Sequence, residues 1–212
     1  MYIAQRALSF MQGFLKSYGP SHIKKVLWDR EFSGTKWDFI DDTAGDCVYP
    51  FLEKYARNGS ILDLGCGPGN TANELAENAY QSYVGVDISQ AALDKATKRT
   101  KKNGREGKNT FARSDFLGFM PSHKFDVILF RESMYHVPFG QVKLMLDRYS
   151  TYLKDDAVFI VRMYKSDSKT GVVKNRVKAK MELIEREFEV LEKSEFGESK
   201  ATVIVFRPRH QS

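Results

Sequence analysis

The sequence predicts an α/β protein with a doubly wound, mostly parallel sheet that helices cover on both faces. Two observations predict this fold class. Short apolar runs alternate with segments of helical periodicity through most of the chain, and such alternation requires right-handed crossovers between parallel strands. The apolar runs are also continuous, which is typical of strands buried on both faces.

The composition indicates one globular domain. A chain of 212 residues, of which 42% are hydrophobic and 28% charged, buries a sizeable core without disulfides or metal. No apolar run approaches the ~20 residues of a membrane span, and the first ten residues lack the pattern of a secretion signal. Cys47 and Cys66 are the only cysteines, and the four histidines show no ligand spacing. We therefore expect a cytoplasmic protein with no metal and no membrane partner.

The N-terminal quarter shows weaker patterns. Apolar residues at helical spacing predict a helix over residues 3–15, which "YGP" ends. Residues 21–43 show no periodicity, so we expect an irregular segment there. A short helix should follow from Tyr49, because Pro50 suits a first helical turn and Gly59 lies beyond the end of the pattern.

The remaining elements follow in regular order. Five strands are expected in "SILDLG", "SYVGVDI", "NTFARSDF", "FDVILFR" and "AVFIVRMY", and an antiparallel pair in "EVLEKSEF" and "ATVIVFRP". "TANELAENA" predicts a helix, and Ser89 is expected to cap another that runs from Gln90 to about Lys102. Two more helices have apolar faces formed by Val142, Met145, Leu146, Tyr149 and Leu153, and by Val177, Met181, Ile184 and Phe188. The sheet should therefore have seven strands.

A glycine-rich turn, "ILDLGCGPGN", follows the first of these strands. Gly65, Gly67 and Gly69 allow a ligand to approach bare backbone at the crevice where doubly wound sheets bind ligands. Asp87, at the tip of the second strand, is placed to accept the hydroxyls of a ribose. A dinucleotide fingerprint would need glycine where Asn70 stands, and no phosphate-binding Gly-Lys-Ser or Gly-Lys-Thr is present. These features predict a ligand that contains adenosine but no phosphates.

"ILDLGCGPGN", "VGVDIS" and "ARSDF" resemble three successive motifs of class I S-adenosylmethionine-dependent methyltransferases, and the resemblance covers roughly residues 45–207. It implies a Rossmann-like methyltransferase fold in which the last strand pair inserts one antiparallel strand. It also implies S-adenosyl-L-methionine as cofactor and S-adenosyl-L-homocysteine as product.

The resemblance implies roles for individual residues. Asp63 and the glycine loop would surround the methionine part, Asp87 would bind the ribose, and Asp115 with Phe116 would meet the adenine. The full set expected at the cofactor is Asp63, Gly65, Cys66, Gly67, Gly69, Asp87, Ile88, Ser114, Asp115, Phe116, Arg131 and Trp37. Other interpretations stay open: Asp115 as a helix-capping acid ahead of "FLGFM", Phe116 as part of the core, and Cys66 as a small packing residue.

Catalytic candidates come from "FRESMYHVP", which follows the fourth strand. Glu132, Tyr135 and His136 should face the methyl acceptor, and His136 is a candidate general base for a hydroxyl, with capping or packing as the alternative. The segment lacks the Asn-Pro-Pro-Tyr or Asp-Pro-Pro-Tyr sequence of adenine and glutamine methylation and the cysteine nucleophile of pyrimidine carbon methylation. We therefore expect a small-molecule acceptor that is methylated on oxygen or nitrogen.

The segment "WDREFSGTKWDFID" combines four aromatic residues with a flexible Ser33–Gly34 pair. This composition predicts a helical arm or lid, residues 1–43, over a cofactor-binding domain, residues 44–212. Similar Gly-x-x-Trp-Asp segments in some small-molecule methyltransferases imply that Trp37 contacts the cofactor carboxylate. Alternatively, Trp28 and Trp37 anchor the arm to the sheet.

Basic residues cluster in "KATKRTKKNGREGK" and "KNRVKAK", and the formal net charge is +6. The clusters indicate either solvated helix faces or a footprint for an anionic partner. Since no aromatic residues interleave with them, a base-stacking surface is not indicated. The alternatives to a small-molecule methyltransferase are therefore an RNA methyltransferase and a non-catalytic cofactor-binding protein. We expect a monomer or a homodimer.

Overall fold

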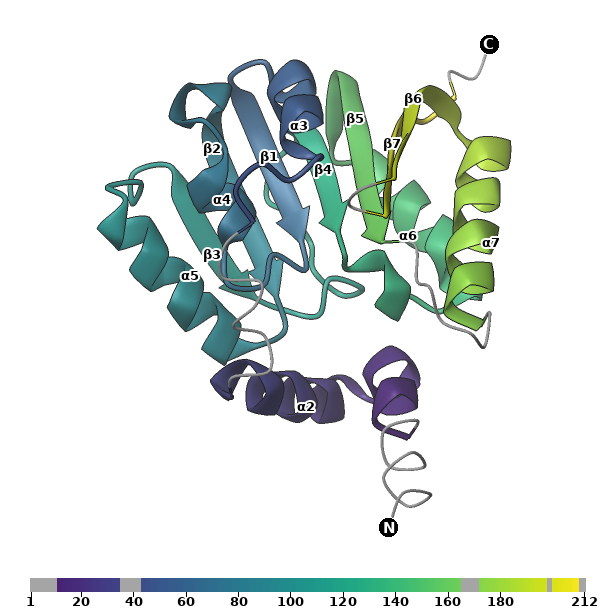
Figure 1. Cartoon of the computed structure of the whole chain (residues 1–212), viewed down its shortest axis with the longest axis horizontal. Coiled ribbons are helices and arrows are strands. Elements are labelled where there is room, and N and C mark those ends of the chain that lie inside the picture. The colour runs from purple at the N-terminus through teal and green to yellow at the C-terminus, as the bar shows by residue number, and fades with distance from the viewer. Residues whose placement is uncertain (1–10, 35–42, 165–171, 198–199, 210–212) are drawn as a thin grey trace.

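The computed structural model describes residues 11–34, 43–164, 172–197 and 200–209, which fold around a seven-stranded sheet (Figure 1). The strand order is β3-β2-β1-β4-β5-β7-β6. The strands are β1 (Gly59–Leu64), β2 (Tyr80–Asp87), β3 (Asn109–Arg113), β4 (Phe125–Arg131), β5 (Leu153–Tyr164), β6 (Glu189–Phe196) and β7 (Ala201–Arg207). β7 runs antiparallel to both of its neighbours, and the other neighbouring pairs are parallel. The predicted fold class, with its inserted antiparallel strand, is confirmed.

The helices are α2 (Ser21–Ser33), α3 (Tyr49–Ala56), α4 (Asn70–Glu74), α5 (Gln90–Lys102), α6 (Phe139–Ser150) and α7 (Val172–Glu187), with short 3-10 turns η2 (Glu77–Ala79) and η3 (Met134–His136). The predicted cap of α5 is confirmed, because Ser89 Oγ accepts a hydrogen bond from the Ala92 backbone nitrogen.

The single helix predicted over "TANELAENA" is wrong, since α4 ends at Glu74 and η2 is separate. Arg105 donates hydrogen bonds to the Ala72 and Leu75 carbonyls, so tertiary donors satisfy the end of α4.

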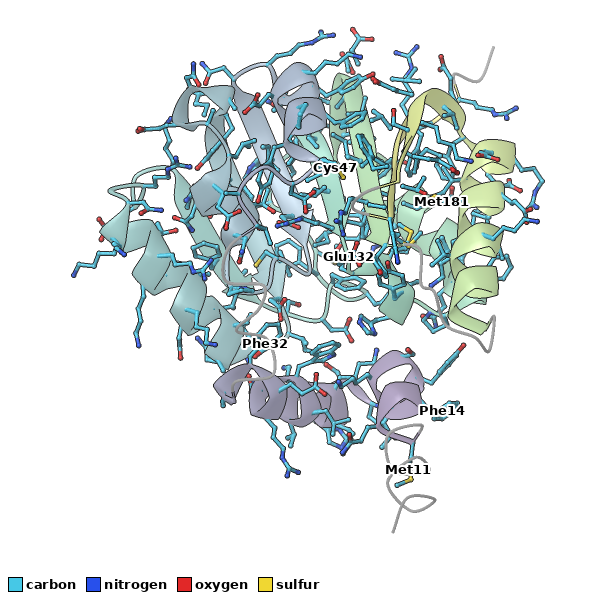
Figure 2. The ribbon with its side chains drawn as sticks, in the orientation of Figure 1. Met11, Phe14, Phe32, Cys47, Glu132 and Met181 are labelled. Carbon is cyan, nitrogen blue, oxygen red and sulfur yellow. The ribbon has the colours of Figure 1, made fainter. Side chains whose placement is uncertain are left out.

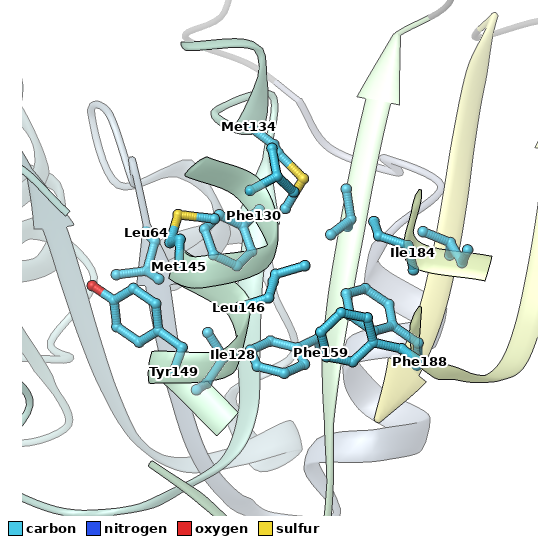
Figure 3. Close-up of a cluster of buried hydrophobic side chains, with 14 of the residues drawn as sticks. Leu64, Ile128, Phe130, Met134, Met145, Leu146, Tyr149, Phe159, Ile184 and Phe188 are labelled. Carbon is cyan, nitrogen blue, oxygen red and sulfur yellow. The ribbon is translucent and has the colours of Figure 1, made fainter. Parts of the chain in front are cut away.

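Two apolar layers hold the sheet. On one face Leu64, Ile128 and Phe130 pack against α6 and α7 (Figure 3). On the other face Ile61, Leu129 and the neighbouring strand residues pack against α3 and α4. The strands between these layers are buried on both sides, which explains their continuous apolar sequences.

The segment before β1 differs from the sequence prediction. Residues 21–33 are helical, so the irregular segment predicted for this part is wrong. α2 carries no apolar stripe that sequence periodicity would reveal, since its buried residues are Lys24 and Phe32. The preceding helical stretch, residues 11–18, ends at "YGP" as predicted, but Phe14 is exposed (Figure 2). Its ring stacks on Tyr18. Residues 3–10 of the predicted helix, and residues 35–42, lie outside the described residues.

α2 lies across the carboxyl ends of the parallel strands (Figure 1). Asp29 holds it there. Its Oδ1 accepts hydrogen bonds from Ser89 Oγ at 2.9 Å and Ala91 N at 3.3 Å, and its Oδ2 from Arg113 Nη2 at 2.6 Å. α2 thus covers the crevice next to the N-terminus of α5. The division of the chain at residues 43 and 44 stays a prediction. In the described part of the chain, no helix has both the length and the apolar character to cross a bilayer.

Candidate active site

A cavity of about 750 Å³ lies between the carboxyl ends of the strands and α2. Its volume is typical of a small-molecule site. The glycine loop and β2 contribute Asp63, Gly65, Cys66, Gly67, Asp87 and Ile88 to its wall. The later strand ends contribute Asp115, Phe116, Arg131, Glu132, Tyr135 and His136. Twelve of the fifteen predicted site residues therefore line one cavity, at the point where strand order reverses between β1 and β4.

Three predicted residues are not placed on this wall. Gly69 does not line the cavity, since it packs on α5: an added Cβ would lie 2.7 Å from the Ala96 Cβ, and its φ of +75° is unfavourable for other residues. Ser114 is also absent from the wall, and its backbone nitrogen donates to the Asp87 carbonyl at 2.9 Å. Trp37 lies outside the described residues.

Asp63 lines the cavity and has one carboxylate oxygen without a hydrogen-bond partner. The side chain is 1% exposed, and its Oδ2 accepts a hydrogen bond from the Tyr83 hydroxyl at 2.5 Å. Its Oδ1 is buried and has no hydrogen-bond partner among the described residues. Burial raises the pKa of this carboxyl to about 6, although the Tyr83 hydroxyl and the charge of Arg131 favour the ionised form. A buried acceptor without a partner indicates a position that a ligand donor completes.

Asp87 connects the glycine loop to the start of α5. Its Oδ2 accepts from the Gly67 backbone nitrogen and its Oδ1 from the Ser89 backbone nitrogen, both at 2.9 Å. Burial raises the pKa of Asp87, and these backbone donors favour its charged form. Each carboxylate oxygen has a further lone pair, so the side chain remains able to accept from the hydroxyls of a ligand.

Asp115 and Phe116 lie at the next strand end. Asp115 Oδ1 accepts from the Leu117 backbone nitrogen at 3.1 Å, and Oδ2 pairs with Lys24 of α2 at 3.2 Å. Residues 116–118 form a turn and not a helix, so the interpretation of Asp115 as a helix cap is wrong; its carboxylate caps that turn and also lines the cavity. The Phe116 ring stands edge-on to Phe130, with 6.2 Å between centroids. It serves both the apolar core and the wall.

The acceptor-side candidates lie beneath α2. The His136 ring stands edge-on to Trp28, with 4.8 Å between centroids. Burial, together with the charges of Lys16 and Lys180, lowers the pKa of His136 to about 4. His136 is thus neutral at pH 7 and weakly basic. The Tyr135 hydroxyl donates to the Tyr164 carbonyl at 2.9 Å, and burial raises the pKa of this tyrosine.

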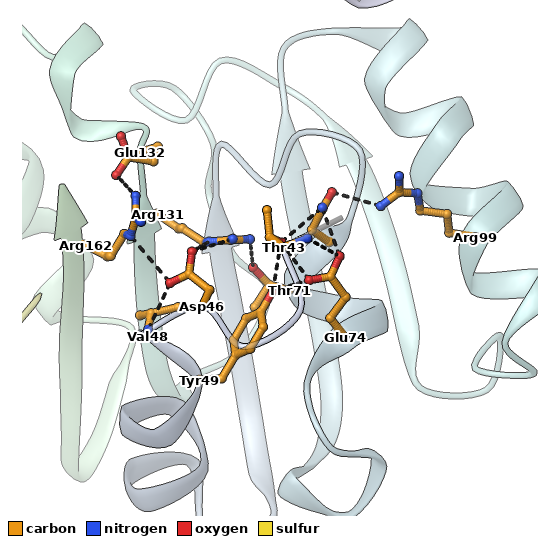
Figure 4. A network of polar contacts seen from close by, with 11 residues as sticks. Thr43, Asp46, Val48, Tyr49, Thr71, Glu74, Arg99, Arg131, Glu132 and Arg162 are labelled. Carbon is orange, nitrogen blue, oxygen red and sulfur yellow. Dashed lines mark hydrogen bonds and ion pairs between the residues drawn. The ribbon is translucent and has the colours of Figure 1, made fainter. Parts of the chain in front are cut away.

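A buried cluster of charges forms part of the same wall (Figure 4). Asp46 Oδ2 accepts from Arg131 Nη2 at 2.7 Å and Nε at 3.2 Å, and Asp46 Oδ1 lies 3.5 Å from Arg162 Nε. Arg162 also pairs with Glu132, whose φ of 55° lies in the left-handed region. Burial alone would raise the pKa of Asp46, but the two guanidinium groups hold it below its usual value.

Residues 56–203, more than half of the chain, match the protein family described as "Methyltransferase domain". The chain belongs to the class I S-adenosylmethionine-dependent methyltransferases. Sterol 24-C-methyltransferase erg6 of Aspergillus fumigatus is 29% identical over 119 residues, which cover 50% of this chain and 31% of that protein. The 27-O-demethylrifamycin SV methyltransferase of Amycolatopsis mediterranei is 27% identical over 119 residues, covering 53% and 44%. The chain thus spans less than half the length of these relatives.

Solved structures share the fold of this methyltransferase domain. The N-methyltransferase NodS from Bradyrhizobium japonicum WM9, in complex with S-adenosyl-L-homocysteine, superposes with a TM-score of 0.66 at 15% identity. The superposition covers 88% of this chain and 98% of NodS.

The donors and acceptors of the cavity fit the family's cofactor. The unpartnered Asp63 Oδ1 suits a cationic amino group, and the spare lone pairs of Asp87 suit ribose hydroxyls. At Gly67 the backbone is bare, since a built Cβ would have only Phe32 of α2 within 4 Å, at 3.8 Å. Among the described residues, no group of three or more histidine, cysteine or carboxylate side chains is arranged to hold a metal ion.

Sequence reasoning missed part of the cavity wall. Lys16, Lys24 and Asp46 line it, together with Asn70 and Thr71 of α4. The first three come from segments without a periodic pattern, so no sequence signal marked them. The glycine loop did point to Asn70, but only as the residue that excludes a dinucleotide.

Proposed function

We propose that this methyltransferase transfers a methyl group from S-adenosylmethionine to an oxygen or nitrogen of a small-molecule acceptor. The observation that carries the proposal is the continuity of the cavity. The same space is lined by the acids expected at the cofactor, Asp63 and Asp87, and by Trp28, Tyr135 and His136 beneath α2. A cavity of about 750 Å³ accommodates a nucleoside cofactor beside an acceptor of modest size.

When bound, the cofactor supplies an activated methyl group on a sulfonium. The chain then has to hold the acceptor in line and exclude water, and these two contributions provide much of the rate in such reactions. Trp28 and Phe32 of α2 provide the apolar cover. Tyr135 is fixed by its hydrogen bond to the Tyr164 carbonyl, which gives the chamber a rigid side wall.

The surroundings of the three catalytic candidates favour positioning over strong base catalysis. His136 accepts a proton only weakly, since its pKa is about 4. Glu132 is engaged by Arg162, and burial raises its pKa. We therefore propose that the acceptor brings an available lone pair, as a neutral amine or an acidic hydroxyl does, and that His136 helps to orient it.

The position of the basic run supports a small acceptor over RNA. α5 begins beside Asp87, whereas its exposed Lys101 and Lys102 occupy its last turn. A helix of 13 residues is about 20 Å long, so these cations lie far from the cavity mouth. The named relatives act on sterol carbon and on a rifamycin oxygen, and NodS is an N-methyltransferase. Family membership therefore does not decide which kind of atom is methylated, and we propose that the residues of the cavity wall do.

Calorimetric titration with S-adenosylhomocysteine tests the proposal. The wild type should bind, and Asp87→Ala should weaken binding at least about tenfold, because hydrogen bonds to a carboxylate are lost. Asp126→Asn is the matched control, since Asp126 is bound to Ser60 and Lys154 and does not line the cavity. Equal affinities in all three proteins would contradict the assignment. Methyl transfer from labelled cofactor to a panel of amines and phenols then identifies the acceptor class.

A further inference from the structure

Tyr83 makes the shortest hydrogen bond to a cofactor-site carboxylate in the described residues. Its hydroxyl donates to Asp63 Oδ2 at 2.5 Å, and the two side chains are 0% and 1% exposed. Asp63 lies on β1 and Tyr83 on β2, where Tyr83 pairs with Ile61. Ile61 and Asp63 are two residues apart and lie on the same face of β1, so the Tyr83 side chain reaches two residues further along the strands to meet Asp63.

The neighbouring position on β2 makes this reach sterically feasible. Gly85 pairs with Asp63, and a Cβ added there would lie 2.8 Å from both Cys66 Sγ and Phe111 Cδ1. The Cys66 and Phe111 side chains therefore fill the space above Gly85, which adds no side chain of its own beside Asp63. The Tyr83 ring is held edge-on to Phe111, with 6.3 Å between centroids. The hydroxyl is therefore fixed by packing, and it fixes the carboxylate in turn.

The result is a carboxylate with one oxygen engaged and the other without a partner. Asp63 lines the cavity, and its Oδ1 is buried with no hydrogen-bond partner among the described residues. The charged or titratable groups that act on it are Arg131 from β4, Asp87 from the end of β2, Cys66 from the glycine loop and Tyr83 itself. Arg131 and the hydroxyls of Tyr83 and Thr71 favour the ionised carboxylate, whereas burial and the charge of Asp87 oppose it.

We propose that Tyr83 is a positioning residue for the cofactor's amino acid portion, because its hydroxyl holds Asp63 with Oδ1 directed at the ammonium group. This inference rests on the proposed function. The hydrogen bond from Tyr83 also helps to keep Asp63 ionised. An ionised carboxylate binds an ammonium group more strongly than a protonated one does, so the affinity should fall as the pH drops through the pKa of Asp63, which is about 6.

The test compares Tyr83→Phe with Tyr80→Phe. Tyr80 is a second buried tyrosine of β2, but its hydroxyl donates to the Ala72 carbonyl and Asn109 Oδ1, not to Asp63. S-adenosylhomocysteine and adenosine are titrated calorimetrically into each protein between pH 5 and 7.5. Adenosine retains the ribose and the base but lacks the amino acid portion with its ammonium group, so it reports any general damage to the cavity.

In Tyr83→Phe, the pH midpoint of S-adenosylhomocysteine binding should rise by about one pH unit. The affinity loss should approach about tenfold at low pH and be small at pH 7.5. Adenosine binding should not change, and Tyr80→Phe should behave like the wild type. In the free protein, the carbon resonance of the Asp63 carboxyl should titrate at higher pH in Tyr83→Phe.

Two results would overturn the inference. The first is an unchanged pH midpoint for S-adenosylhomocysteine in Tyr83→Phe, and the second is an equal loss of adenosine affinity. A wild type that binds neither ligand would instead remove the proposed function, and the role of Tyr83 with it.

Discussion

Replacing Asp46 by asparagine removes one negative charge from a buried cluster that contains two guanidinium groups. Asp46 is 7% exposed at its side chain, and Arg131 and Arg162 are 12% and 13% exposed. Asparagine retains an oxygen that accepts from the Val48 backbone nitrogen, as Asp46 Oδ1 does at 3.0 Å. The substitution therefore tests the charge and leaves the shape of the cluster nearly unchanged.

The expected cost follows from this burial. Removing one partner of a buried ion pair typically costs about 3–5 kcal/mol, because the remaining charge is left without compensation. Arg162 keeps Glu132 as a partner, so we expect the lower end, about 3 kcal/mol. For a chain of this size that loss corresponds to a fall in Tm of roughly 6–12 °C.

Urea and thermal unfolding at pH 7 measure the effect. The control is Asp147→Asn, since Asp147 forms an exposed pair with Lys143 in which each side chain is 47% exposed, and we expect a loss below about 0.5 kcal/mol there. Because the folded pKa of Asp46 is lowered from 3.8, its stabilisation is complete above that pH and is lost as the pH falls through the folded pKa. If Asp46→Asn lowers the free energy of unfolding no more than Asp147→Asn does, the two guanidinium groups do not need the charge of Asp46 for compensation, and the reasoning is refuted.

Three further predictions concern the cavity and its cover. The proton resonance of the His136 ring should titrate near pH 4, and Lys180→Met should raise that midpoint because it removes a nearby cation; an unchanged midpoint would exclude the coupling. Gly69→Ala should cost about 1–3 kcal/mol in urea unfolding, given its positive φ and the 2.7 Å approach to the Ala96 Cβ. Ala96→Gly in the same chain should recover part of that loss, and no recovery would contradict the steric account. Asp29→Ala should speed amide hydrogen exchange in α2 while α6 stays unchanged, and identical rates would mean that other contacts hold α2.

Much of the fold was predictable because its signals are local. Continuous apolar runs follow from burial on both faces of a strand, and the Ser89 cap followed from its place before a helical pattern. α2 was not predicted because it lacks such a local signal. Its buried side chains include Lys24, a charged residue that lies against Asp115, so burial and hydrophobicity do not coincide along it. The break after α4 depends on Arg105, about 30 residues later in the chain.

The sequence by itself determined the sheet, the glycine loop and the acids at successive strand ends, since a strand's periodicity and a turn's need for glycine are properties of short segments. Only the tertiary structure decided which oxygens remain available. Tyr83, 20 residues later in sequence, engages Asp63 Oδ2, whereas Oδ1 has no partner among the described residues. Likewise His136 is weakly basic because α2 buries it and lysines from two other helical segments surround it. Desolvation and charge coupling depend on distances in space, and these distances cannot be read from the spacing of residues along the chain.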